Sequence, residues 1–151
     1  MKSAKYQHVF LGTTKQGKVA IFKTSGNDDT HIILRGGEKP NYDASDIEQC
    51  ISTLAEEKTN MNLMVDFSNG NSQKNHENQK IVCKSIAEQI EKGNKHITGV
   101  MIESHLKEGN QKMSENLEYG KSITDSCICW EETKQLIKEL ADSVKKRREI
   151  G

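Results

Sequence analysis

The stretch His31-Ile32-Ile33-Leu34-Arg35-Gly36-Gly37 decides the fold. Its three consecutive large apolar residues predict a parallel strand that is buried on both faces. The arginine stands where this strand ends, and the two glycines let the backbone turn. A guanidinium in that place can hold a phosphate or a carboxylate through two parallel hydrogen bonds. The alternative interpretation of Arg35 is a surface arginine that caps the strand.

A β-hairpin and three strand-and-helix units are predicted along the chain. The hairpin spans residues 8–22 and turns through a glycine-containing loop. The β/α units span residues 31–58, 62–93 and 97–148, and their spacing is that of βαβ units. Because such crossovers are right-handed, the three strands are expected to be parallel. We expect a single domain over residues 1–151.

Apolar residues at helical spacing predict three helices. The first begins at a capping box in which Ser45 is the N-cap and Glu48 lies three residues later. The second spans residues 77–92 and stops at Gly93, and the third starts near Trp130. The residues predicted to face inward are Ile47, Ile51, Leu54 and Ala55 in the first helix, Ile81, Val82, Ile86 and Ile90 in the second, and Leu136, Ile137, Leu140, Ala141 and Val144 in the third.

The chain is poor in apolar residues for an α/β domain. Hydrophobic residues make up 33% of its 151 residues and charged residues 29%, and the mean hydropathy is −0.77. A sheet that is covered on both faces needs more apolar side chains than this. Three parallel strands also leave two open edges, which natural proteins avoid. We therefore expect an incomplete sheet or barrel, with a core that is thin or is completed by another chain segment.

Charge and cysteine content argue against several classes of function. The 22 basic and 22 acidic residues cancel, so no broad nucleic-acid or membrane-binding surface is expected. The basic run 145–148 is interpreted as a helix C-terminus, where cations complement the dipole. The four cysteines include no C-x-x-C pair, and Cys50 and Cys83 are expected to be buried free thiols in helices. No signal-peptide core or run of transmembrane length occurs, so we expect a cytoplasmic location.

Polar residues follow each predicted strand at its carboxyl end. Arg35 follows the first, Asp66 and Asn69 the second and Glu103 the third, while Asp125 closes a long loop. Ligands bind at this end of the strands in barrels and in open α/β sheets. An arginine with several oxygen ligands suits an anionic, phosphorylated substrate and a hard divalent cation. The alternative is that Glu103 and Asp125 are helix caps or partners in loop salt bridges.

Other catalytic chemistries have little support. The five histidines are scattered, and only His105 lies near the predicted site, where a solvent-exposed loop histidine is the simpler interpretation. No serine has the context of a nucleophile elbow, and no glycine-rich phosphate loop follows a strand.

Several ordered motifs together resemble the C-terminal part of the class I DAHP synthases, the phospho-2-dehydro-3-deoxyheptonate aldolases. The resemblance covers residues 5 to 148, and its first residues look most similar to the tryptophan-sensitive branch. The matching segments are Thr24–Asn27, His31–Gly37 with Pro40–Tyr42, Asp66–Ser68 with Gly70–Asn71, Gly99–Ser104, Glu108–Gln111, Tyr119–Asp125 and Trp130–Glu131.

The resemblance implies a (β/α)8 barrel of which this chain carries the last three units, preceded by a hairpin. It implies a transferase of aromatic amino-acid biosynthesis that condenses phosphoenolpyruvate with erythrose 4-phosphate, the first step of the shikimate pathway. Arg35 matches a phosphoenolpyruvate-binding arginine, and Glu103 and Asp125 match two of four ligands to a divalent metal such as manganese or iron. Phe10 and Phe22 match positions in the hairpin that line the site of an aromatic amino-acid effector.

Two departures from the family pattern weaken these implications. The family has a metal-ligating histidine after Asp-Phe-Ser, where this chain has Asn69, and an amide oxygen is a poorer ligand for manganese or iron. The family's N-terminal half, with a cysteine ligand and further substrate-binding residues, has no counterpart here. We therefore expect a fragment.

Two functions follow, besides an unrelated phosphate-binding α/β module as a third interpretation. The first is the C-terminal portion of a DAHP synthase, which need not be active alone. The alternative is a non-catalytic remnant or partner subunit that docks on a complementary half or on an intact synthase through its open strand edges. A homo-oligomer, or association with the missing half, is expected in either case.

Overall fold

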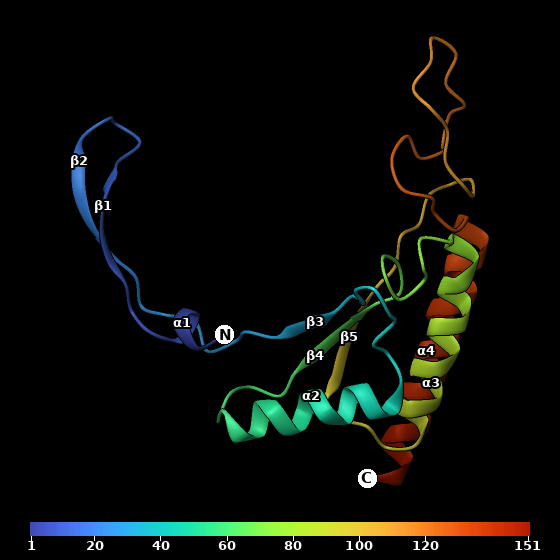
Figure 1. The fold of residues 1–151 in the computed structure, drawn as a ribbon, viewed down its shortest axis with the longest axis horizontal. Helices are drawn as coiled ribbons and strands as arrows, with labels where there is room; N and C mark the ends of the chain where they lie inside the picture. The colour runs from blue at the N-terminus through green and yellow to red at the C-terminus, as the bar shows by residue number, and fades with distance from the viewer.

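The structure is a computed structural model that describes residues 1–151. Its elements alternate between strands and helices after an N-terminal hairpin (Figure 1). In chain order they are α1 (Lys2–Lys5), β1 (Val9–Thr13), β2 (Val19–Lys23), β3 (Ile32–Leu34), α2 (Ala44–Glu56), β4 (Leu63–Asp66), the 3-10 turn η1 (His76–Asn78), α3 (Gln79–Glu91), β5 (Ile97–Met101) and α4 (Trp130–Ile150).

The three central strands form one parallel sheet in the order β3-β4-β5, as predicted. Ile33 is in register with Met64, and Met64 is in register with Gly99, with a register shift between β4 and β5 at Leu63 and Met64. Each strand is followed by a helix, so the chain makes the predicted series of crossovers. All three carboxyl ends consequently lie along one edge of the sheet.

Helices cover one face of this sheet. In Figure 1, α2 lies along one side of the strands, and α3 and α4 run side by side. Apolar residues of the strands pack against these helices in one continuous core. The fully buried hydrophobic members of that core are Ile47, Leu63, Val65, Phe67, Val82, Cys83, Ile86 and Ile128.

The other face of the sheet is open. Ile33 is 43% exposed and Met101 is 41% exposed, although both lie in strands. The prediction that the run 32–34 is buried on both faces is therefore wrong, because only its alternate residues meet the helices. Only 25 of the 151 residues are buried, so the core is thin, as the composition suggested.

The predicted hairpin is present, and it stands away from the sheet (Figure 1). Strands β1 and β2 pair antiparallel, and the rings of Phe10 and Phe22 stack with centroids 5.7 Å apart. Its apolar side chains are largely solvent-exposed, with Val19 at 77%. An isolated two-stranded hairpin is marginal in water, and the stacked phenylalanines add a side-chain contact between its two strands.

The helices begin and face somewhat differently from the predictions. Helix α2 starts at Ala44, and the Asp43 carbonyl already accepts the first helical bond from the Ile47 amide at 3.1 Å. Ser45 therefore lies inside the helix, and the predicted capping box is wrong. In α3, Ile81 is 59% exposed because Cys83 takes the inward position instead.

The inward stripes of α2 and α4 are also narrower than predicted. Ile137, Ala141 and Ala55 are exposed, whereas Leu136 and Leu54 are buried. Helix α4 contacts the rest of the chain mainly through α3, so a single row of its side chains is covered. Its basic C-terminal residues lie in the last turns, as predicted. None of the helices has both the length and the apolar character that a membrane span requires.

All four cysteines are free thiols. Cys83 is fully buried in α3, and burial raises the pKa of its thiol to about 12. Cys50, which lies in α2, is only half-buried, so the prediction of burial holds for one of the two helical cysteines.

The loops after β3 and β4 meet backbone to backbone. A Cβ atom on Gly70 would lie 2.7 Å from the Gly36 carbonyl carbon and 2.8 Å from the Gly37 nitrogen. The Gly70 amide donates to the Arg35 carbonyl at 3.0 Å. Gly36 has a φ of +72°, which disfavours a side chain there. The two glycines therefore allow the contact that fixes the edge of the sheet.

Replacing Gly70 by alanine is expected to destabilise the fold by about 2 kcal/mol or more, because two backbone segments must move apart. The matched control is Gly37→Ala, since nothing lies within 4 Å of a Cβ atom built on Gly37. That control is expected to stay within about 0.5 kcal/mol of the unmodified chain. Chemical denaturation followed by circular dichroism measures both, and equal losses would contradict the proposed contact.

Candidate functional site

Arg35, Asn69 and Asp66 form a hydrogen-bonded chain at the carboxyl ends of β3 and β4. Arg35 Nη2 donates to Asn69 Oδ1 at 2.7 Å. Asn69 Nδ2 in turn donates to Asp66 Oδ2 at 2.6 Å. The other oxygen of Asp66 accepts from the amide and the hydroxyl of Ser68, at 2.9 and 2.7 Å. Asp66 is buried, so its carboxylate is a fixed acceptor at the base of this chain.

Asn71 holds the ends of β3 and β4 together beneath these side chains. Its Nδ2 donates to the carbonyls of Leu34 and Asp66, at 3.1 and 2.8 Å. Its Oδ1 accepts from the Asn41 amide at 2.8 Å, and Asn41 accepts from the Gly36 amide at 2.7 Å. Buried polar groups need such partners. Asn71 therefore ties together both strand ends and the loop that leads into α2.

Glu103 is placed by α3. It follows β5, where its backbone amide and carbonyl bond the side chain of Gln79, at 2.9 and 3.0 Å. The Glu103 carbonyl also accepts from the Ile128 amide at 3.1 Å. Gln79 is fully buried, so this double contact fixes the backbone of Glu103 at the end of β5.

Asp125 is brought to the same edge by the long loop between β5 and α4. This loop projects from the sheet in Figure 1 and returns through isolated bridges, one of which pairs Gly109 with Cys127. Its neighbour Ser126 bonds His76 Nδ1 of η1 at 2.8 Å. The loop is thus fastened directly after Asp125.

A small hollow of about 130 Å³ lies between Asn69, Glu103 and Asp125. This volume is below the ~300–1,000 Å³ of typical ligand sites, so the hollow is too small for a whole metabolite. Of the predicted site residues, Asn69, Glu103 and Asp125 line the hollow, and Arg35 reaches it through Asn69. His105 is exposed and lies outside this lining.

Three lining residues did not emerge from the sequence. They are Ser72, Lys74 and Ser126, and Lys74 is the one cation of the lining. Each lies within five residues of Asn69 or next to Asp125, so closeness in sequence was the available signal. Lys74 has a φ of +60°, which shows that the turn after Asn69 is tight.

The carboxylates of the hollow repel one another. Burial raises the pKa of Glu103 above its ordinary value, and the negative charge of Asp125 raises it further. The nearby Ser68 hydroxyl and the charge of Arg35 act in the opposite direction. The site therefore has an excess of acidic groups that a bound cation or a proton would relieve.

The residues present do not complete a metal site. Nowhere in residues 1–151 do three or more His, Cys, Asp or Glu side chains gather as metal ligands. The hollow offers two carboxylates, Glu103 and Asp125, and the amide of Asn69. That amide already has its oxygen bound to Arg35 and its nitrogen bound to Asp66. No imidazole, the ligand type that suits iron, lines the hollow.

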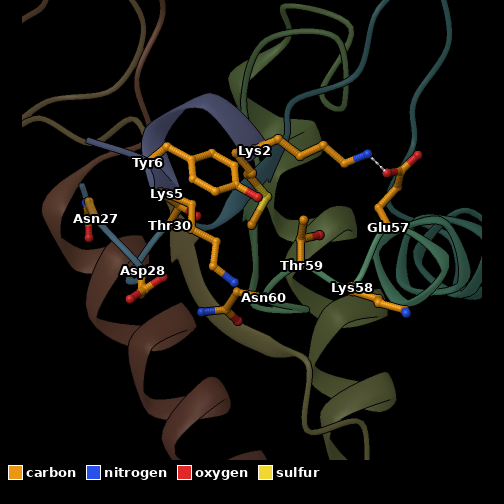
Figure 2. A pocket seen from close by; sticks show the side chains of 11 residues that line it. Lys2, Lys5, Tyr6, Asn27, Asp28, Thr30, Glu57, Lys58, Thr59 and Asn60 are labelled. Carbon is orange, nitrogen blue, oxygen red and sulfur yellow. Dashed lines mark ion pairs between the residues drawn. The ribbon is translucent and has the colours of Figure 1, made fainter. Parts of the chain in front are cut away.

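A larger hollow of about 410 Å³ lies at the opposite end of the strands (Figure 2). It is lined by α1, by the segment before β3 and by the loop between α2 and β4, and Lys2 pairs with Glu57 across it. No histidine or cysteine lines it. Ligands of parallel sheets bind at the carboxyl ends of the strands, so this hollow is not the candidate site.

Comparison with known families agrees with the geometry at the sheet edge. The sequence profile described as the DAHP synthetase I family matches residues 1–138. The chain belongs to this family. The resemblance inferred from the motifs is thereby confirmed.

Relatives within the family cover nearly the whole chain. A phospho-2-dehydro-3-deoxyheptonate aldolase of Alternaria alternata is 53% identical over 98% of the chain and 41% of its own length. The Trp-sensitive enzyme of Escherichia coli K12 is 48% identical over 97% of the chain and 43% of its own length. The chain thus spans well under half the length of these relatives.

A solved structure of the family has the same fold as this chain. It is the phospho-2-dehydro-3-deoxyheptonate aldolase of Francisella tularensis SCHU S4, with 47% sequence identity and a TM-score of 0.91. The match covers 97% of this chain and 43% of that one.

The comparisons do not separate the branches of the family. The Phe-sensitive enzyme of E. coli K12 is 50% identical over 143 residues, close to the value for the Trp-sensitive enzyme. The assignment to the tryptophan-sensitive branch therefore stays a prediction.

Glu103→Gln is expected to stabilise the chain at neutral pH. The folded pKa of Glu103 is raised, so the folded state binds its proton more tightly than the unfolded state. Stability therefore falls as pH rises from the ordinary carboxyl pKa through the raised one. The glutamine variant is expected to lack this fall. The measurement is the difference between the denaturation midpoints at pH 4 and pH 7. Glu115→Gln, on the exposed part of the same loop, is the control and should leave the fall unchanged.

Proposed function

We propose that this chain carries the C-terminal part of a DAHP synthase, the transferase that condenses phosphoenolpyruvate with erythrose 4-phosphate. The product is 3-deoxy-D-arabino-heptulosonate 7-phosphate, the first intermediate of the shikimate pathway. The observation that supports this is the gathering of Arg35, Asn69, Glu103 and Asp125 at one edge of a parallel sheet, in a chain of this family.

The fold that we propose is three consecutive units of a (β/α)8 barrel, with the hairpin as an addition. The exposed side chains on one sheet face support this, since that face becomes the interior when a barrel closes. The open edges at β3 and β5 support it too, because barrels have no edge strands. The domain then comprises the units 31–58, 62–93 and 97–148.

Arg35 is proposed to hold phosphoenolpyruvate. Its guanidinium presents five N–H donors, of which the hydrogen bond to Asn69 uses one. The remaining donors can grip a phosphate or carboxylate in a fixed fork, which places the substrate for reaction. Glu103 and Asp125 face the same hollow. Because this chain lacks a complete set of metal ligands, no catalytic step is assigned to a metal here.

The hairpin is proposed to contribute to an aromatic amino-acid effector site. Phe10 and Phe22 stack on each other, and Phe22 remains 37% exposed. An exposed aromatic pair can receive another aromatic ring through offset or edge-to-face contact.

A partner subunit is the second candidate function. Exposed apolar residues on the open sheet face and on the hairpin favour it, because such surfaces mark interaction sites. The partner would be a complementary half or an intact synthase. Co-expression with the part of the E. coli Trp-sensitive enzyme that this chain does not match distinguishes the two. Erythrose 4-phosphate-dependent consumption of phosphoenolpyruvate by the co-purified pair supports the first function, and co-purification without turnover supports the second.

Arg35→Ala is expected to weaken phosphoenolpyruvate binding by the purified chain roughly 10- to 100-fold. Hydrogen bonds to charged groups contribute about 1.5–3 kcal/mol each, which corresponds to that range. Arg35→Lys keeps the charge but loses the fork, so an intermediate affinity is expected. Phosphorus NMR titration measures all three proteins.

The control for this experiment is Arg148→Ala, which removes the same charge from the exposed end of α4. It should leave the affinity unchanged. If Arg35→Ala and Arg148→Ala bind phosphoenolpyruvate equally well, Arg35 does not hold the substrate.

A further inference from the structure

We propose that Asn69 is a positioning residue that holds the Arg35 guanidinium at the sheet edge in the place of a metal ligand. The inference rests on the proposed function, because it assigns Arg35 to the binding of an anion. It goes beyond that function by making the grip on the anion independent of a divalent metal. The observation that carries it is the pair of short hydrogen bonds to the two ends of one amide.

The bridging role follows from the donors and acceptors involved. The Arg35 guanidinium only donates hydrogen bonds, and the ionised Asp66 carboxylate only accepts them. A primary amide does both at once, without a proton to gain or lose. Asn69 therefore joins a donor to an acceptor through one rigid group, with contacts of 2.7 and 2.6 Å.

The same bonds disfavour a metal at Asn69. Its oxygen is the only amide atom that could ligate a cation, and a cation there would lie beside the positively charged guanidinium of Arg35, which already donates to that oxygen. A neutral imidazole at this position could also bridge, by donating from one nitrogen and accepting at the other. It would then have no lone pair left for a metal, so a histidine at position 69 could either bridge or ligate, but not both.

The amide also keeps Arg35 available. Arg35 and Asp66 form no direct ion pair in this structure, since Asn69 stands between them. A bidentate pair with Asp66 would occupy the donor fork that an anion needs. The bridge fixes one amino group of the guanidinium and leaves the others free.

The backbone suits asparagine at this position. Asn69 has a φ of +51°, a left-handed conformation that asparagine tolerates better than most residues. Its carbonyl accepts from the Lys74 amide at 3.0 Å and from the Ser72 hydroxyl at 3.3 Å. Both the backbone and the side chain of Asn69 are thus held, which is what a positioning residue requires.

The test uses the full chain and three variants, with phosphoenolpyruvate affinity measured with and without EDTA and Mn²⁺ binding measured in EDTA-free buffer. Asn69→Gly removes the side chain without strain at positive φ. Asn69→Asp keeps an oxygen that can accept from Arg35 but loses the donor to Asp66. Asn69→His supplies an imidazole. Nitrogen-15 NMR of the Arg35 guanidinium reports whether its rotation is hindered, phosphorus NMR gives the phosphoenolpyruvate affinity, and the electron paramagnetic resonance of free Mn²⁺ gives metal binding.

Hindered rotation of the Arg35 guanidinium is expected in the unmodified chain and in Asn69→Asp. It is expected to be lost in Asn69→Gly. Phosphoenolpyruvate affinity should fall about 2- to 10-fold in Asn69→Gly, the range for one net hydrogen bond. EDTA should not change the affinity of the unmodified chain. Asn69→His should bind Mn²⁺ at least about 10-fold more tightly, since even outer-shell partners of metal ligands are worth that much.

Two results would overturn the inference. One is an Arg35 signal and an affinity that stay unchanged in Asn69→Gly while that variant keeps its thermal unfolding midpoint. The other is Mn²⁺ binding by the unmodified chain that Asn69→Gly abolishes, since Asn69 would then be a ligand. Failure of the proposed function gives a different result. In that case the unmodified chain binds phosphoenolpyruvate no better than Arg35→Ala does, but the hindered rotation of the Arg35 guanidinium is still lost in Asn69→Gly.

Discussion

The contact between the loops after β3 and β4 is the constraint on which the candidate site depends. Gly36 and Gly70 let two backbones approach to a distance that a side chain would prevent. Asn71 then bonds the last carbonyl of each strand. Because Arg35 precedes one glycine and Asn69 precedes the other, their side chains must meet. The hydrogen-bonded chain from Arg35 to Asp66 is a consequence of this backbone geometry.

The electrostatics of the edge follow from that meeting. Opposite charges on Arg35 and Asp66 are held apart by a neutral amide, while Glu103 and Asp125 share a small hollow with Lys74. Burial and like charge disfavour ionisation of Glu103. An arginine and an acidic pocket thus lie side by side, in a chain of the DAHP synthetase I family.

Much of the fold could be predicted from the sequence because its signals are local. The run 32–34 and the spacing of the three units gave the parallel strands, since each signal lies within one element or crossover. The errors concern which side of an element is covered. Ile33 and Ile81 are apolar and lie in the expected elements, but they face solvent. Local periodicity cannot show which faces the rest of the chain covers, and the start of α2 at Ala44 was likewise set by the loop before it.

The sequence by itself determined the family, the order of the elements and the strand ends at which polar residues appear, because these depend on residue type and spacing. Only the tertiary structure decided what Asn69 does. In the sequence, Asn69 stands where the family has a histidine. The sequence therefore shows only that a histidine ligand is missing. In three dimensions Asn69 is the bridge between Arg35 and Asp66. The physical reason is that hydrogen bonds between residues 34 positions apart depend on how two loops pack, which no local pattern encodes.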